Sequence, residues 1–269
     1  MSESNNLRKQ YFVSQSAALT ALTCWFPFMS RCVYTEVNYI KPTFKEEYKK
    51  YFSRFINSYK GIEPYFVAQF FYPIIDISTT QIAKILAKNN TPQFEHNLIA
   101  ATITGAGSPI LFNPLKAIIV ATQNKQFNNS FQTINHIYNT GKFIHFYKGS
   151  TFFMIRNATF TPCLFILPNY FETKLNSYSQ LQNTVIAQPI SYLLSAAIAV
   201  TVSMPMDVYS SVSLSDPNKH IYKSNWSIIK MTYQKKGFTS LFAGLKWRLL
   251  ATTIEFGIYN IAKKLYNCL

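Results

Sequence analysis

The sequence predicts an all-α membrane protein, with six transmembrane helices in three tandem two-helix repeats around a central cavity and short amphipathic helices on one side of the membrane. Composition is the first reason. Of the 269 residues, 48% are hydrophobic and only 14% are charged, whereas soluble domains carry about 25% charged residues. The second reason is a pattern of prolines and glycines that recurs three times along the chain.

Each repeat is marked by a proline late in an apolar stretch and by a glycine that follows it. The prolines are Pro27, Pro114 and Pro205, which lie 87 and 91 residues apart. The glycines end the elements Tyr59-Lys60-Gly61, Tyr147-Lys148-Gly149 and Phe242-Ala243-Gly244, and they follow the prolines by 34, 35 and 39 residues. These nearly constant offsets predict a single domain over residues 1–269, with repeats at about 10–90, 91–180 and 181–269.

The first helix of each repeat is expected at about 10–36, 94–123 and 184–213. These stretches are rich in small residues, as in SAALTALT, AATITGAG and SAAIAVTV, and small residues let membrane helices approach closely. Proline removes a backbone donor and clashes with the preceding turn. We therefore expect kinks at Pro27, Pro114 and Pro205.

A polar linker and a second spanning helix complete each repeat. Residues 44–59 place Phe44, Tyr48, Phe52 and Phe55 on one helical face among lysines, which is typical of a helix lying in the membrane interface. The second spans are expected at about 62–88, 150–175 and 245–267, each near the roughly 20 residues that a span requires. A soluble helical protein with buried aromatic helices is the alternative, and the repeat disfavours it.

Charge and cysteine usage narrow the class of partner. The net charge of +15 indicates an anionic partner. Because the basic residues lie between and at the ends of apolar stretches, they favour anionic lipid and a small anionic solute over nucleic acid. We find no secretory signal, no metal or cofactor motif and no catalytic motif, so we expect a protein without cofactor or metal that is not an enzyme.

Charged residues inside the expected spans are the candidates for a solute site, because each costs roughly 2.5–3.5 kcal/mol at the membrane centre. Counted from the repeat glycine, Arg156 stands at +7, Glu255 at +11 and Asp76 at +15, and steps of four share a helix face. Arg156 is the leading candidate, since its guanidinium can bind a carboxylate or phosphate with two hydrogen bonds. Alternatively, it only pairs with Asp76 or Glu255. Arg248 is expected to snorkel to the interface.

The repeated P-x-[DE]-x-x-[KR] register and the aromatic–basic–glycine element resemble the mitochondrial carrier family. The resemblance covers essentially the whole chain and includes GFTSLFAGLKWRLLATTIEFGIYNIAKKL in the third repeat. It implies a monomeric multi-pass carrier of the mitochondrial inner membrane, working by alternating access, with the amphipathic helices on the matrix side. The main solute contacts would stand at +7 and +8, which adds Gln69, Asn157 and Thr252 to Arg156, Asp76 and Glu255 as candidate binding residues.

The resemblance also implies a gate and a lipid site. In the family, six charges after the prolines close the matrix side, but here Asp207 is the one retained acid and Lys116 occupies an acidic position. We expect these two to pair, with Gln123 as a brace. Met29, Cys32, Ile119 and Ser210 replace the other charges, so the empty carrier should switch readily. Lys60, Gly61, Lys148 and Gly149 precede helix starts and are expected to bind an acidic phospholipid such as cardiolipin.

The solute is the least determined feature. The Asn/Ile/Lys-rich composition and the degraded motifs are similar to those of nucleotide-carrier mimics that intracellular microbes deliver to host mitochondria, which favours adenine nucleotides (ATP/ADP). The Arg156-Asn157 pair is more similar to carboxylate carriers, and Asp76 with Glu255 would suit an amino acid. Carboxylates, phosphate and amino acids are therefore alternatives. A non-transporting membrane scaffold is the alternative of another class.

Overall fold

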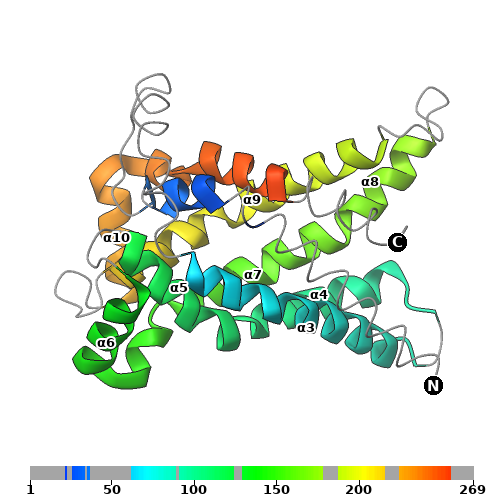
Figure 1. Cartoon of the computed structure of the whole chain (residues 1–269). Coiled ribbons are helices and arrows are strands. Elements are labelled where there is room, and N and C mark those ends of the chain that lie inside the picture. Colours follow the sequence, from blue (N-terminus) through cyan, green and yellow to red (C-terminus); the bar gives the residue numbers. More distant parts are fainter. Residues whose placement is uncertain are drawn as a thin grey trace.

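The structure is a computed structural model that describes residues 22, 26–33, 35–36, 62–88, 91–123, 129–177, 187–215 and 224–255. These described residues form α-helices and short 3-10 turns, with no strand among them (Figure 1). The expected helical class is therefore confirmed for this part of the chain. The predicted interface helix at 44–59, together with Lys60 and Gly61, lies outside the described residues.

Helices occur where the repeat predicts them, in the order α3 (Glu63–Leu86), α4 (Phe94–Gly107), α5 (Pro109–Gln123), α6 (Ser130–Gly141), η2 (Lys142–Tyr147), α7 (Ser150–Phe165), α8 (Leu167–Asn176), α9 (Ala187–Ser215), α10 (Asn225–Lys236) and η3 (Gly237–Phe242). Residues 26–33, 35–36 and 245–255 are also helical. α6 and α10 lie at the same end of the bundle (Figure 1).

The first helix of the second repeat bends at a place that the sequence does not predict. α4 and α5 meet at Ser108 with a bend of 49°, six residues before Pro114, and α5 continues through Pro114. Pro109 is the first residue of α5, and it has no N–H with which to continue the hydrogen bonds of α4. The backbone N–H of Ser108 instead donates to both Thr104 and Gly105. α9 continues through Pro205 without a break.

The second helix of the second repeat is also divided. The sequence predicts one span over 150–175, but α7 ends at Phe165 and α8 begins at Leu167. Pro168 cannot donate a hydrogen bond to the carbonyl of Leu164, and its ring crowds that turn. Two consecutive helices therefore replace the straight span.

The long helices pack in an order that follows the repeats. α3 packs against α4 and α5, and α7 packs against α4 and α9. Two of the repeat glycines make further close approaches because they have no Cβ, and both also have a left-handed backbone, which favours glycine. Gly149 (φ 67°) lies against Ser210 and Ser213 of α9, and Gly244 (φ 86°) lies against Cys32 of the first repeat. Each glycine thus contacts the first helix of another repeat.

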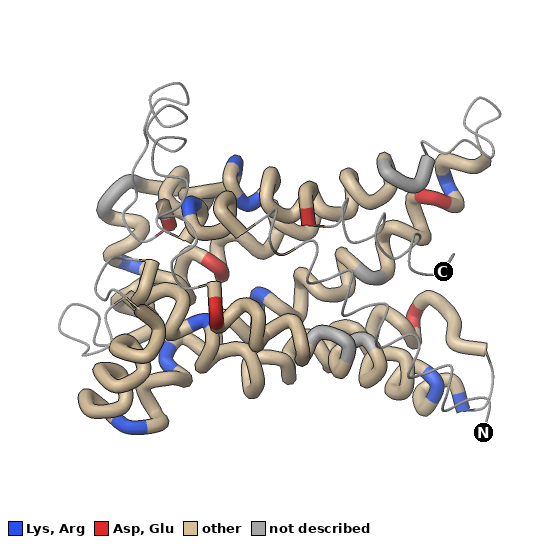
Figure 2. Tube along the Cα trace, viewed as in Figure 1, with Lys and Arg blue, Asp and Glu red and all other residues tan. Residues whose placement is uncertain are grey.

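Apolar surface covers much of these helices. Within the described residues, Ile190–Ser215 is long and apolar enough to cross a membrane, and the bent pair α4 and α5 would count as a second span if taken together. Charged residues gather at helix ends and in one group between the helices (Figure 2). The arrangement of six spans around a cavity stays a prediction.

Candidate functional site

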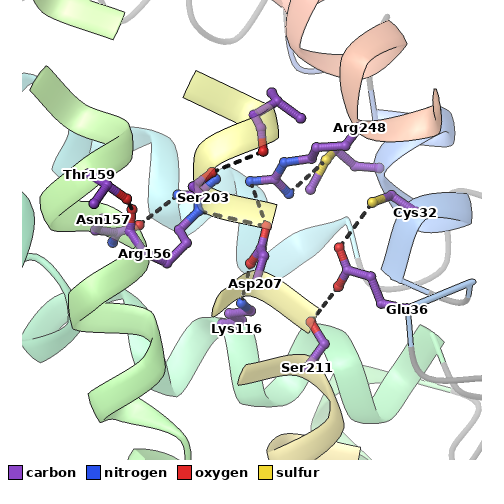
Figure 3. A network of polar contacts seen from close by, with 12 residues as sticks. Cys32, Glu36, Lys116, Arg156, Asn157, Thr159, Ser203, Asp207, Ser211 and Arg248 are labelled. Carbon is purple, nitrogen blue, oxygen red and sulfur yellow. Dashed lines mark hydrogen bonds and ion pairs between the residues drawn. The ribbon is translucent and has the colours of Figure 1, made fainter. Parts of the chain in front are cut away.

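The charged group between the helices is centred on Asp207 of α9, which is 3% exposed. Its Oδ1 atom accepts from Nζ of Lys116 at 2.7 Å. Its Oδ2 atom lies 3.2 Å from Nη2 of Arg248 and 3.7 Å from Nε of Arg156. The cations come from α5, α7 and the helix at 245–255, so one carboxylate joins three separate segments (Figure 3).

One ion pair of this cluster was expected from the sequence, and a second was not. Lys116 and Asp207 form the ion pair that the proline register predicts. Arg156 was expected to bind the solute, with pairing to Asp76 or Glu255 as the alternative, and the structure gives it an ion pair with Asp207, the acid predicted to belong to the gate. The Asp76 side chain is outside the described part, and Glu255 lies within electrostatic range of both arginines. The candidate solute residue and the candidate gate residue are therefore in direct contact.

Arg156 is held in place through Asn157 and the break between α4 and α5. Its Nη1 atom donates to Oδ1 of Asn157 at 2.6 Å, and Nδ2 of Asn157 donates to Oγ of Ser108 at 2.7 Å. Gly105 lets α7 come close, since a Cβ there would overlap the Asn157 carbonyl oxygen. The unpredicted break thus supplies the hydroxyl of Ser108 that accepts from Asn157, and Asn157 in turn orients the arginine.

Arg248 is buried in the cluster rather than snorkelling to the interface. Its side chain is 12% exposed, and its Nη1 atom donates to the sulfur of Met29 at 3.1 Å. Because Arg248 stands four residues after Gly244, its side chain was expected at the membrane interface. Asp207 and the thioether of Met29 instead bind its guanidinium inside the bundle. Buried charges persist only where they are paired, and Asp207 provides that pairing.

Phe160 is a member of the site that the sequence reasoning missed. The guanidinium carbons of Arg156 and Arg248 lie 3.8 and 5.8 Å from the centre of its ring, within the range of cation–π attraction. Phe160 stands eleven residues after Gly149, on the helix face that carries Arg156. Its spacing of four from Arg156 was the available signal.

A second set of hydrogen bonds, which was not predicted from the sequence, joins the first and third repeats. Glu36 is 1% exposed and accepts hydrogen bonds from the thiol of Cys32 and the hydroxyl of Ser211. Glu36 follows Pro27 by nine residues, the same offset by which Gln123 follows Pro114. The repeat register was therefore a signal for Glu36. Among the described residues, neither amide atom of the buried Gln123 has a hydrogen-bond partner, and its role as a brace stays a prediction.

The sequence is similar to that of known proteins over most of its length. A family model described as "Mitochondrial carrier protein" matches residues 90–179 and 182–268, well over half of the chain. The chain belongs to the mitochondrial carrier family. Its members transport solutes, which is the activity expected here in place of catalysis. A mitochondrial glycine transporter from Vanderwaltozyma polyspora is 24% identical over 188 residues, which are 63% of this chain and 62% of the relative. The chain thus spans less than two thirds of that relative.

The remaining candidate positions of this carrier lie inside the bundle or at a helix start. Gln69 and Thr252 are each 2% exposed, and Asn157 is 5% exposed. Gly149 is the N-cap of α7, and the carbonyl of Lys148 accepts from Asn113 at 3.2 Å. The +7 and +8 positions are therefore interior, as a solute site requires. The lipid and gate functions stay predictions.

Proposed function

We propose that the chain is a multi-pass carrier of the mitochondrial inner membrane, with six spans in three repeats around a central cavity. The packing order supports this proposal. α3 of the first repeat packs on α4 and α5 of the second, and α7 of the second packs on α9 of the third. The third repeat returns to the first through Trp247 against Phe28, with ring centres 6.3 Å apart, and Arg248 against Met29. Such a cyclic order is what a ring of three repeats requires.

The solute that the site supports best is a small amino acid. In the described cluster, Asp207 forms ion pairs with Lys116, Arg156 and Arg248, and two further acids, Glu36 and Glu255, interact electrostatically with these cations. A polyanion such as ATP would bring several negative charges to a site that already contains acids, and buried unpaired charge is costly. A zwitterion brings both signs, its carboxylate for the arginines and its ammonium for Glu255.

The glycine transporter that this chain resembles supports the same class of solute. The presence of both cations and acids in the cluster, more than the resemblance, carries the proposal. Adenine nucleotides, which the composition favours, remain the second candidate because the whole chain carries a net charge of +15. Dicarboxylates and phosphate can also bind the arginines, but they have no ammonium group that could pair with Glu255.

Uptake by liposomes tests the proposal. The purified full chain, in vesicles that contain cardiolipin, is given labelled glycine, alanine, serine, malate, phosphate, ADP or ATP. Each solute is offered to vesicles preloaded with the same compound and to empty vesicles. We expect amino acids to accumulate and nucleotides to remain outside. Uptake of ADP or ATP would reassign the solute, and uptake of none would favour a membrane scaffold.

We also propose that the start of α7 binds an acidic phospholipid. α7 begins directly after Gly149, and backbone N–H groups at a helix start attract anions, with Lys148 beside them. Cardiolipin should therefore raise the melting temperature of the monomeric protein in detergent. The rise should shrink in a Lys60→Ala, Lys148→Ala double variant and persist in Lys174→Ala, which changes an exposed lysine in the last turn of α8. Equal rises in all three proteins would contradict the site.

A further inference from the structure

A continuous chain of hydrogen bonds leads from the break between α4 and α5 to Arg156. The hydroxyl of Ser108 donates to the carbonyl oxygen of Gly105 at 2.8 Å and accepts from the side-chain amide of Asn157 at 2.7 Å. The side-chain oxygen of Asn157 accepts in turn from Nη1 of Arg156 at 2.6 Å (Figure 3). Ser108, Asn157 and Arg156 are all buried, so water is kept from replacing a lost partner.

The proline at the break sets the direction of this chain. In an uninterrupted helix, the N–H of residue 109 would donate to the carbonyl oxygen of Gly105, four residues earlier. Pro109 has no N–H, and the Gly105 oxygen instead accepts from the hydroxyl of Ser108 and from its N–H at 3.3 Å. A hydroxyl has one proton to donate. Because that proton goes to Gly105, the Ser108 oxygen can only accept from Asn157.

This direction decides which end of the Asn157 amide faces Arg156. The amide has donors on its nitrogen and an acceptor at its oxygen. Since Ser108 takes a donor, the nitrogen faces Ser108 and the oxygen faces Arg156, which has donors only. A reversed amide would place N–H groups against N–H groups. The face of the Arg156 guanidinium lies 3.8 Å from the ring centre of Phe160, so both an edge and a face of the cation are held.

We propose that Ser108 is a positioning residue of the solute site, whose hydroxyl fixes the Asn157 amide and, through it, the guanidinium of Arg156. The proposal rests on the carboxylate-bearing solute proposed above. Ser108 acts through Asn157 and needs no contact with the solute. An arginine that is already oriented loses less conformational freedom when it binds a carboxylate. Removal of the Ser108 hydroxyl therefore weakens solute binding while the helices remain packed.

The KM for glycine of Ser108→Ala, in the liposome assay with equal amounts of inserted protein, tests this role. We expect KM to rise roughly three- to tenfold, as the loss of one buried hydrogen bond implies, with a maximal rate within about twofold of the wild type. Ser108→Thr keeps the hydroxyl and should restore the wild-type KM. Thr102→Ala removes an exposed hydroxyl from the same helix, and Glu95→Gln changes an exposed acid in its first turn. Both controls should match the wild type.

A double-variant comparison tests whether Ser108 acts through Asn157. Asn157→Ala and the double variant Ser108→Ala, Asn157→Ala should have the same KM, whereas independent effects would multiply. If Ser108→Ala does not insert, Ser108→Cys replaces it, because a thiol is a weak donor and a weak acceptor.

Two results would overturn the positioning role. One is an unchanged KM in the inserted Ser108 variant, even with a lower melting temperature, because a purely structural hydroxyl would behave in this way. The other is a KM of the double variant that is the product of the two single effects. If the wild type takes up none of the offered solutes, the proposed function fails instead, and the two failures are thereby distinguished.

Discussion

At the scale of residues, the cluster shows how a carrier with a degraded charge ring keeps its helices together. Asp207 forms ion pairs with Lys116, Arg156 and Arg248. Glu36 links the first and third repeats by accepting hydrogen bonds from Cys32 and Ser211. Met29 and Cys32 replace charged residues of the family pattern, yet each is a hydrogen-bond partner here. Hydrogen bonds and one shared acid thus take the place of separate ion pairs.

Glu36→Ala should lower the melting temperature in detergent, because the thiol of Cys32 and the hydroxyl of Ser211 would lose their acceptor. A buried donor without a partner costs about 1–3 kcal/mol. Glu36→Gln is the matched variant, since its carbonyl can accept from Cys32 and its amide can donate to the rotatable hydroxyl of Ser211. Equal melting temperatures for the two variants would show that the hydrogen bonds contribute little.

The sequence predicts part of this cluster and misses part of it for physical reasons. Lys116 and Asp207 were predictable because a repeat register places residues of different repeats at equal heights. Phe160 had its spacing of four from Arg156 as a signal, whereas the role of Arg248 depends on which way its side chain turns at a crowded helix contact. A buried arginine turns toward its acid, and single-sequence patterns do not reveal that acid when it lies on another helix.

At the scale of elements, helix breaks rather than the repeat prolines shape the second repeat. α5 and α9 continue through Pro114 and Pro205, whereas breaks occur at Ser108 and Ile166, each close to an additional proline. The recurring prolines are conspicuous in the sequence, but the local backbone hydrogen bonds decide where a helix bends. Helix positions were therefore predictable, whereas the breaks at Ser108 and Ile166 were not.

Gly105→Ala should destabilise the carrier and reduce transport. Its Cβ would overlap the Asn157 carbonyl oxygen and lie 2.8 Å from the Thr161 hydroxyl, so α7 must move and shift Arg156 with it. Overpacking of this kind costs about 1–3 kcal/mol. Gly107→Ala is the control on the same helix, because nothing lies within 4 Å of its Cβ. Melting temperature and glycine uptake measure both variants, and equal values would contradict the close approach.

At the scale of the whole molecule, the described helices pack in the order of the predicted repeats, with second helices against first helices. The period of the prolines and glycines predicts the repeats, and the described contacts follow their order. The repeat register singles out Asp207 as a partner of Lys116, but it does not indicate that the same acid also contacts Arg156 and Arg248. That feature arises only when distant residues meet in the folded chain.

Six spans require both ends of the chain to lie on the same side of the membrane. Single cysteines at Ser4 and Asn267, placed in a variant whose four native cysteines are replaced by serine, should react with a membrane-impermeant thiol reagent from one compartment. Liposomes of known orientation, labelled before and after permeabilisation, measure this. Reaction from opposite compartments would require an odd number of spans and would contradict the three-repeat arrangement.

Glycine uptake by Arg156→Ala tests most directly that the cluster around Asp207 is the transport site. The measurement compares wild type, Arg156→Ala, Arg156→Lys and Glu95→Gln in liposomes with equal amounts of inserted protein. We predict that Arg156→Ala abolishes uptake and that Arg156→Lys retains less than about half of it, because lysine lacks the two-pronged guanidinium. Glu95→Gln should transport like the wild type. If Arg156→Ala takes up glycine as fast as the wild type does, this cluster is not the solute site.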